Sequence, residues 1–207
     1  MREIFYEESA EIQNKKSAST KYNIFKVLSI VSYVLFVLWC VIVLTIYPLS
    51  GNVLVDIIGI ILPMLAFLPS GIILGRIKNK FYVEYDYTFV SGSIRFSKII
   101  KNTKRKFIIK FDVSSIEKLG KYGSQTFNKY EAMPGINKLI LTSNYEATSG
   151  KDFYYLVINY AGAKKLLILE CTEIFMVNIL KFASKNIIEE DFKWYILIMP
   201  PLQSHQR

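Results

Sequence analysis

The sequence predicts a membrane α-helical hairpin joined to a mainly-β soluble domain of about seven strands that ends in one helix. Three features predict this arrangement: two long apolar runs near the N-terminus, alternating apolar and polar residues after them, and an amphipathic segment near the C-terminus. The chain has 207 residues, enough for one such domain beside the hairpin.

The two apolar runs cover residues 27–47 and 53–75. Each is long enough to cross a hydrocarbon layer of roughly 30 Å as a helix, which takes about 20 residues. Only a short uncharged connection separates the runs, so we expect the two helices to turn back on each other as an antiparallel hairpin. A cleaved signal peptide would have a shorter apolar region, so we expect no cleavage here.

Basic residues predict how the hairpin is oriented, because cationic flanks of membrane helices stay in the cytoplasm. They lie before the first run and after the second: Lys15, Lys16, Lys21, Lys26, Arg76, Lys78 and Lys80. We therefore expect a multi-pass protein of the bacterial cytoplasmic membrane with both termini in the cytoplasm. The abundance of Lys, Ile and Asn is typical of an AT-rich bacterial genome, and this bias supplies part of the formal net charge of +9.

The second apolar run carries the irregular residues. Gly71 and Gly75 are four residues apart on one helix face, a spacing that allows close helix packing, most simply against the first helix of the same chain. Pro63 and Pro69 predict a kink. Asp56 is close to the outer interface, where it can reach water, so we do not interpret it as part of an ion pathway.

After the hairpin, the pattern changes to the alternation of strands. Residues 81–89 alternate strictly, a turn follows at 91–93, and strands at 94–101 and 104–111 complete an antiparallel meander. In the last of these strands we expect one shared face for four residues: Arg105, Phe107, Ile109 and Phe111.

The pattern is weaker after Asp112. We expect a short strand at 116–119, a loop at 120–135, and three more strands at 136–142, 152–160 and 164–170. Thr172 can cap a helix from 173 to about 185. The buried stripe of that helix is expected to comprise Phe175, Met176, Ile179, Leu180, Ala183 and Ile187. The chain then divides into a cytoplasmic N-terminal segment 1–26, a hairpin 27–75, a domain 76–187 and a tail 188–207.

About seven antiparallel strands closed by one C-terminal helix is the layout of a pleckstrin-homology-like (PH-like) domain, a partial barrel capped by its helix. The chain resembles an uncharacterised bacterial family of small proteins with two transmembrane helices and a cytoplasmic PH-like domain. The resemblance rests on the hairpin and on three short passages: residues 85–89 leading to Gly92, the Lys-rich strand from Lys104 to Asp112, and Leu169-Glu170. It implies no catalytic residues.

Catalytic and metal-binding patterns are missing from the sequence. The single histidine, His205, lies in a polar tail; Cys40 and Cys171 are far apart, and there is no phosphate-binding glycine loop. We therefore expect no enzyme activity, no cofactor and no metal. The adjacent carboxylates at 189–191 could hold a divalent cation weakly, but a solvated linker is expected. The apolar segment 194–199 is too short to span a bilayer, and predicts either an added strand or packing on the domain, or an interfacial anchor through its aromatic residues.

One cluster of basic residues remains as a candidate binding surface: Lys98, Lys101, Lys104, Arg105, Lys106 and Lys110. Near an anionic leaflet, such residues contribute about 1 kcal/mol each, although a merely soluble strand face explains them equally well. We expect a non-enzymatic, membrane-anchored binding module that engages a membrane-protein partner or anionic lipid headgroups. The alternative is a small subunit or regulator of a transporter or envelope complex, recognised through the hairpin. Nucleic acid is not an expected partner, and a homo-oligomer stays open.

Overall fold

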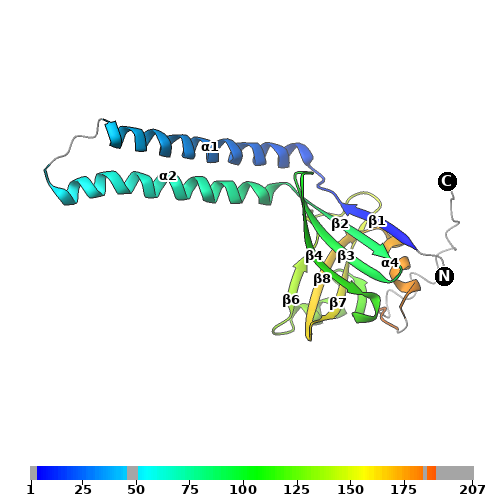
Figure 1. The fold of residues 1–207 in the computed structure, drawn as a ribbon. Helices are drawn as coiled ribbons and strands as arrows, with labels where there is room; N and C mark the ends of the chain where they lie inside the picture. The colour runs from blue at the N-terminus through cyan, green and yellow to red at the C-terminus, as the bar shows by residue number, and fades with distance from the viewer. Residues whose placement is uncertain (1–3, 46–50, 184–185, 190–207) are drawn as a thin grey trace. The chain divides into compact units, whose positions relative to one another are not determined.

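A computed structural model describes residues 4–45, 51–183 and 186–189 of the chain. The chain forms two compact units. One unit, residues 14–83, contains two long helices. The other combines residues 1–13 with everything from residue 84 onward, and contains two β-sheets with shorter helices (Figure 1).

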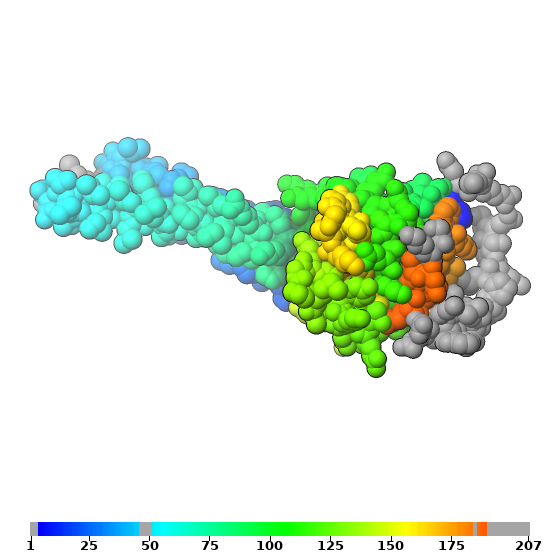
Figure 2. All heavy atoms as spheres, turned by 90° about the horizontal axis from the view of Figure 1, so that it is seen from below, coloured from blue at the N-terminus to red at the C-terminus, as the bar shows by residue number. Residues whose placement is uncertain are grey.

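The helical unit consists of α1 (Lys15–Thr45) and α2 (Val53–Phe81), which are in contact and lie side by side in Figure 1, whereas in Figure 2 α2 is in front of α1. Both helices are long and apolar enough to cross a membrane. Their outer surfaces carry exposed side chains such as Val34, Leu38 and Leu62. α2 continues through both of its prolines as one helix.

The first sheet contains the predicted meander of β2 (Val83–Val90), β3 (Ser93–Ile100) and β4 (Lys104–Asp112), in the order β1-β2-β3-β4. Its edge strand β1 (Phe5–Ala10) was not predicted, because the sequence analysis assigned residues 1–26 to a separate segment. β1 pairs antiparallel with β2, from Phe5 opposite Val90 to Ala10 opposite Tyr85. The helical hairpin is therefore inserted between two neighbouring strands of one sheet.

The second sheet has the order β5-β7-β8-β6, and comprises β5 (Ile116–Lys121), β6 (Asn137–Ile140), β7 (Asp152–Tyr160) and β8 (Ala163–Cys171). A short 3-10 helix, η1 (Val113–Ser115), precedes β5. β6 runs parallel to β8, so the expectation of purely antiparallel strands was wrong. The described residues form eight strands in two sheets, and α4 (Glu173–Lys181) follows them.

The expected loop at 120–135 contains a helix, α3 (Gln125–Glu131). Ser124 caps it by accepting a hydrogen bond from the Phe127 amide at 3.1 Å. Phe127 then packs on Tyr155 in a small second core on the outer face of β7 and β8. This helix explains why residues 154–158 are buried without alternation: both faces of the strand are covered.

The main core lies between the inner faces of the two sheets and α4. Tyr87, Phe89 and Phe96 come from the first sheet, and Leu156 and Leu167 from the second. The predicted stripe of α4 contributes its fully buried members: Phe175, Met176 and Ile179. The apolar periodicity of this segment therefore located the closing helix correctly.

Glu8 joins β1 to the rest of the domain. Its carboxylate accepts hydrogen bonds from the Thr172 amide at 2.9 Å and from the Thr172 hydroxyl at 3.0 Å. The Lys151 ammonium lies 3.2 Å away, and both charged side chains are largely buried. Thr172 occupies the expected N-cap position of α4, but its hydroxyl bonds to Glu8 and makes no capping bond.

We predict that Glu8→Gln destabilises the chain by about 2–4 kcal/mol, because it leaves the Lys151 charge buried without its counter-charge. Glu7→Gln is the matched control: Glu7 is the next residue along β1, is half exposed, and lies 3.7 Å from Arg105. Glu7→Gln should lower the free energy of unfolding by less than about 1 kcal/mol. Denaturant unfolding in detergent, followed by circular dichroism, measures both values; equal losses would contradict the assigned role of Glu8.

Candidate functional site

The six basic residues of the candidate surface lie on β3, on β4 and in the turn between them. Lys98 pairs with Lys106 across the two strands, and Ile100 pairs with Lys104. Lys101 and Asn102 form the tight turn with positive φ angles of 47° and 54°. Such a turn brings five of the six residues together at one end of the sheet, whereas Lys110 pairs with Arg95 toward the other end.

A β-bulge divides this cluster between the two faces of the sheet. Phe96 pairs with Ile109 but Ser97 pairs with Phe107, so one extra residue lies in β4. Paired residues share a face, and Arg105 and Phe107 are therefore on the face opposite to that of Ile109. The expectation of one shared face was wrong: Ile109 is buried, whereas Phe107 is 56% exposed.

The bulge leaves two different groups of basic residues. Lys98, Lys104 and Lys106 share one face, whereas Arg105 and Lys110 are on the other. Lys110 pairs there with Arg95, whose guanidinium lies 5.5 Å from the centre of the Phe107 ring. Single-strand alternation did not reveal this division because a bulge shifts the period by one residue.

The Arg105 side chain makes ionic contacts within the domain. Its guanidinium forms an ion pair with Asp86 of β2, whose carboxylate is almost completely buried, and Glu7 of β1 lies 3.7 Å away. A buried carboxylate requires such a counter-charge. Arg105 therefore stabilises the sheet, and the candidate surface reduces to Lys98, Lys101, Lys104 and Lys106, which we call the basic turn.

The basic turn lies at the end of the sheet where the chain arrives from the helical hairpin. β3 ends and β4 begins there, beside the first residues of β2. α2 ends at Phe81, and β2 begins at Val83. Lys104 and Lys106 are exposed and make no ion pair among the described residues.

The two glycines of α2 lie against α1 of the same chain. A Cβ atom on Gly71 would come within 2.9 Å of the Tyr33 ring, and one on Gly75 would lie 3.3 Å from the Ser29 hydroxyl. The Ser29 hydroxyl donates a hydrogen bond to the Gly71 carbonyl at 2.8 Å. A hydroxyl bonded to the facing backbone is a suitable contact for helices in an apolar environment.

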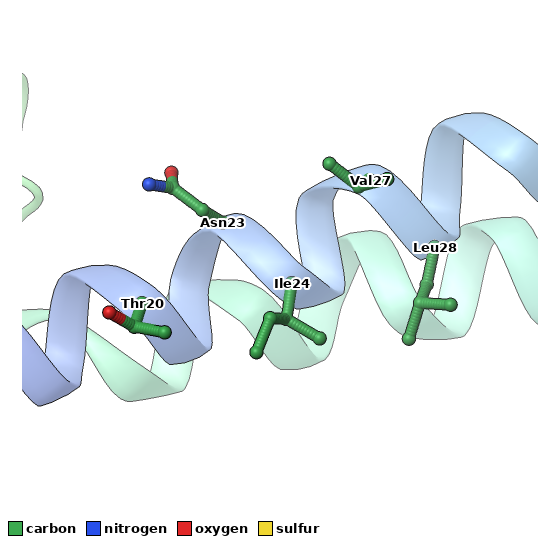
Figure 3. Close-up of a pocket in the computed structure, with 5 residues that line it drawn as sticks. All are labelled: Thr20, Asn23, Ile24, Val27 and Leu28. Carbon is green, nitrogen blue, oxygen red and sulfur yellow. The ribbon is translucent and has the colours of Figure 1, made fainter.

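The surface of α1 changes from polar to apolar within two turns. A shallow hollow of about 410 Å³ on this helix is lined by residues from both sides of the change (Figure 3): Thr20, Asn23, Ile24, Val27 and Leu28. Its wall carries no ionisable group, so the hollow offers no chemistry of its own. It marks the level at which the apolar part of α1 begins.

A buried carboxylate that the sequence did not reveal organises the loop between β6 and β7. Glu170 accepts hydrogen bonds from Asn144 at 2.8 Å, from the amide and hydroxyl of Thr148 at 2.9 and 2.8 Å, and from the Thr142 hydroxyl. Burial raises its pKa, but these hydrogen bonds outweigh burial, so the pKa of Glu170 lies below its usual range. The only sequence signal was a carboxylate in an apolar strand.

Reactive groups are scarce in the described part of the chain. Burial raises the pKa of the Cys171 thiol well above its usual value, which makes it a poor nucleophile. Glu189 is buried rather than solvated, and it accepts a hydrogen bond from the Thr126 amide at 3.3 Å. The described residues contain no group of three potential metal ligands. His205, the other two tail carboxylates and the apolar segment 194–199 lie outside the described residues.

We predict that Glu170→Gln destabilises the chain at pH 7 by about 1–3 kcal/mol, because the amide can replace only some of these bonds. A carboxyl group whose pKa is depressed in the folded state stabilises the fold above its unfolded pKa of about 4.3. This stabilisation is lost as the pH falls through the folded pKa. The two proteins should therefore converge in stability as the pH falls from about 4.3 through the lower folded pKa of Glu170. Unfolding curves across this range measure the difference, with the surface variant Glu131→Gln as control; a difference that does not change with pH would contradict the assignment.

Comparisons with known proteins show the family of the chain. No curated protein and no solved structure gave a significant match. A family model described as a bacterial PH-like domain matches residues 3–189, a range that includes β1, both long helices and both sheets. The resemblance inferred from the sequence is thereby confirmed, and the chain belongs to the bacterial PH-like domain family DUF6106.

Proposed function

We propose that this chain is a membrane-anchored, non-enzymatic binding module whose basic turn contacts anionic lipid headgroups at the inner face of the bacterial cytoplasmic membrane. The observation that carries the proposal is the position of the basic turn at the end of the sheet that α2 enters. Binding of a membrane-protein partner to the basic turn is the alternative explanation for the same surface.

Membrane anchoring is supported by the surface of the helical hairpin. Large apolar side chains are exposed along both helices, with Leu44 at 84% and Leu54 at 71%. Contiguous apolar surfaces of this extent are unfavourable in water. Both helices also satisfy the length and hydropathy required for a span.

The length of α2 beyond its apolar run supports contact between the basic turn and headgroups. The run ends at Gly75 and the helix ends at Phe81, about 9 Å further at 1.5 Å per residue. The headgroup layer extends about 5–8 Å beyond the hydrocarbon. Since β2 begins two residues after Phe81, its end of the sheet can approach headgroups within a Debye length of about 8 Å.

The alternative function, recognition of a larger complex through the hairpin, receives less support. The two glycines expected to provide the recognition face are covered by Ser29 and Tyr33 of α1. A helix from another protein could not pack closely at the same place without displacing α1. The absence of an enzyme activity stays a proposal that rests on the sequence and on the unreactive Cys171 thiol.

We predict that reversing two charges, Lys104→Glu with Lys106→Glu, weakens docking of the domain on an anionic bilayer by roughly 30-fold. This factor corresponds to the loss of about 1 kcal/mol of binding free energy for each lysine. The full chain carries a fluorophore at Asn102→Cys, in a Cys40→Ser background, in nanodiscs that contain a headgroup quencher. Quenching should be stronger in phosphatidylglycerol than in phosphatidylcholine, and should weaken with salt.

The matched control reverses Arg95 and Lys110, which pair on the same two strands but on the opposite face. Their reversal should leave quenching unchanged. Equal quenching in both lipids, or an equal effect of both double variants, would contradict lipid contact and favour a protein partner for the basic turn.

The proposed orientation predicts which cysteines are accessible from outside. In the Cys40→Ser background, a membrane-impermeant maleimide should label Ser50→Cys in right-side-out vesicles. It should label Lys129→Cys, on the exposed face of α3, only after the vesicles are permeabilised. The reverse pattern would place the domain outside the cell and remove the basis for contact with the inner leaflet.

A further inference from the structure

We propose that the apolar C-terminal segment of this chain, residues 194–199, docks in a groove on the outer face of the second sheet. This inference does not depend on lipid binding. It rests on the groove itself, on the path of the last described residues, and on the composition of the segment that follows them.

The groove has a volume of about 360 Å³ and lies beside the loop that Glu170 organises. Its apolar lining comprises Tyr122, Ile140, Tyr145, Phe153 and Ile168. Ile140 is 59% exposed, Tyr122 is 47% exposed, and the Tyr145 side chain is fully exposed. The groove therefore offers partly uncovered aromatic and aliphatic side chains to which an apolar segment can bind.

The polar lining of the groove includes Asn144, which several hydrogen bonds hold in place. Asn144 donates a hydrogen bond to the Glu11 carbonyl at 2.7 Å and accepts one from the Gln13 amide at 3.1 Å. Its amide also bonds to the buried carboxylate of Glu170. A wall fixed by this many bonds is organised before a ligand arrives, which reduces the entropic cost of docking.

The last described residues lead toward this groove. Residues 187–189 run parallel to β5: the Leu119 amide donates to the Ile187 carbonyl at 2.8 Å, and the Glu189 amide donates to the Leu119 carbonyl at 3.0 Å. The direction of β5 at this point leads to Tyr122, the first wall residue of the groove.

Glu189 is held firmly where the described chain ends. Its side chain bonds to the Thr126 amide at 3.3 Å and to the Tyr155 hydroxyl at 3.4 Å. A Cβ atom on Gly120 would clash with the Glu189 carboxylate and would lie 2.8 Å from the Tyr155 ring, so only glycine leaves room for this carboxylate. The last described residue is therefore fixed beside β5, where the segment after it begins.

The reach and composition of the following segment fit the groove. Trp194 is five residues beyond Glu189, which allows a span of up to about 17 Å, whereas Leu119 and Tyr122 are separated by about 10 Å of strand. Residues 194–199 read Trp-Tyr-Ile-Leu-Ile-Met, the longest apolar run after β8. A short tether gives such a segment an effective concentration in the millimolar range. Residues 190–207 also lie beyond the range matched by the family model.

The test uses Trp194 fluorescence in the full chain in detergent, with Trp39→Phe leaving one tryptophan. Docking predicts blue-shifted emission and several-fold protection from acrylamide quenching. Ile140→Ser with Tyr145→Ser should remove most of this protection. Phe107→Ser, an exposed apolar residue of the first sheet, is the matched control and should leave it unchanged.

A second measurement keeps the test decisive if the groove variant misfolds. In the Cys40→Ser background, Tyr145→Cys with Ile196→Cys should form a disulfide on mild oxidation, whereas Phe107→Cys with Ile196→Cys should not. Three results would overturn the proposal: quenching of Trp194 as in free tryptophan, protection that survives both groove substitutions in a folded chain, or equal cross-linking of the two cysteine pairs. Protection that survives both groove substitutions would place the segment elsewhere, such as at the membrane interface.

Discussion

The pairing of β1 with β2 is the constraint on which the rest of the structure depends. These neighbouring strands are separated in sequence by the whole helical hairpin, so both ends of the hairpin are joined to one end of a single sheet. The pairing is secured by Glu8, whose bonds to Thr172 and Lys151 connect the edge strand to the start of α4 and the start of β7. Without these contacts, β1 would be a short unpaired segment before α1.

This topology explains why the β3–β4 turn is the strongest candidate surface. An antiparallel meander alternates its ends, so the start of β2, the end of β3 and the start of β4 are all at the end that α2 enters. Charge alone does not define the surface. Arg105 neutralises buried Asp86, and Lys110 lies on the other face, whereas Lys104 and Lys106 remain exposed.

Buried carboxylates hold the irregular parts of the domain together. Glu170 orders the loop after β6, Glu189 holds the last described residues beside β5, and Asp86 is paired within the first sheet. Each is supported by hydrogen bonds or a counter-charge, which makes burial of a carboxylate tolerable. The groove at Tyr145 is a consequence of this arrangement, because the bonds to Glu170 and to the chain before α1 shape its polar wall.

The sequence by itself determined those elements whose signal is local. Apolar run length predicted two long helices, alternation predicted β2 to β4, and a helical stripe predicted α4 with Phe175, Met176 and Ile179 buried. Only the tertiary structure decided β1, α3 and the parallel pairing of β6, because each is stabilised by contacts with distant segments. The same holds for the site: the basic residues were visible in the sequence, but the bulge in β4, opposite Phe96 and Ser97, decided which of them share a face. A one-residue shift in register leaves no trace in composition and reverses every side chain beyond it.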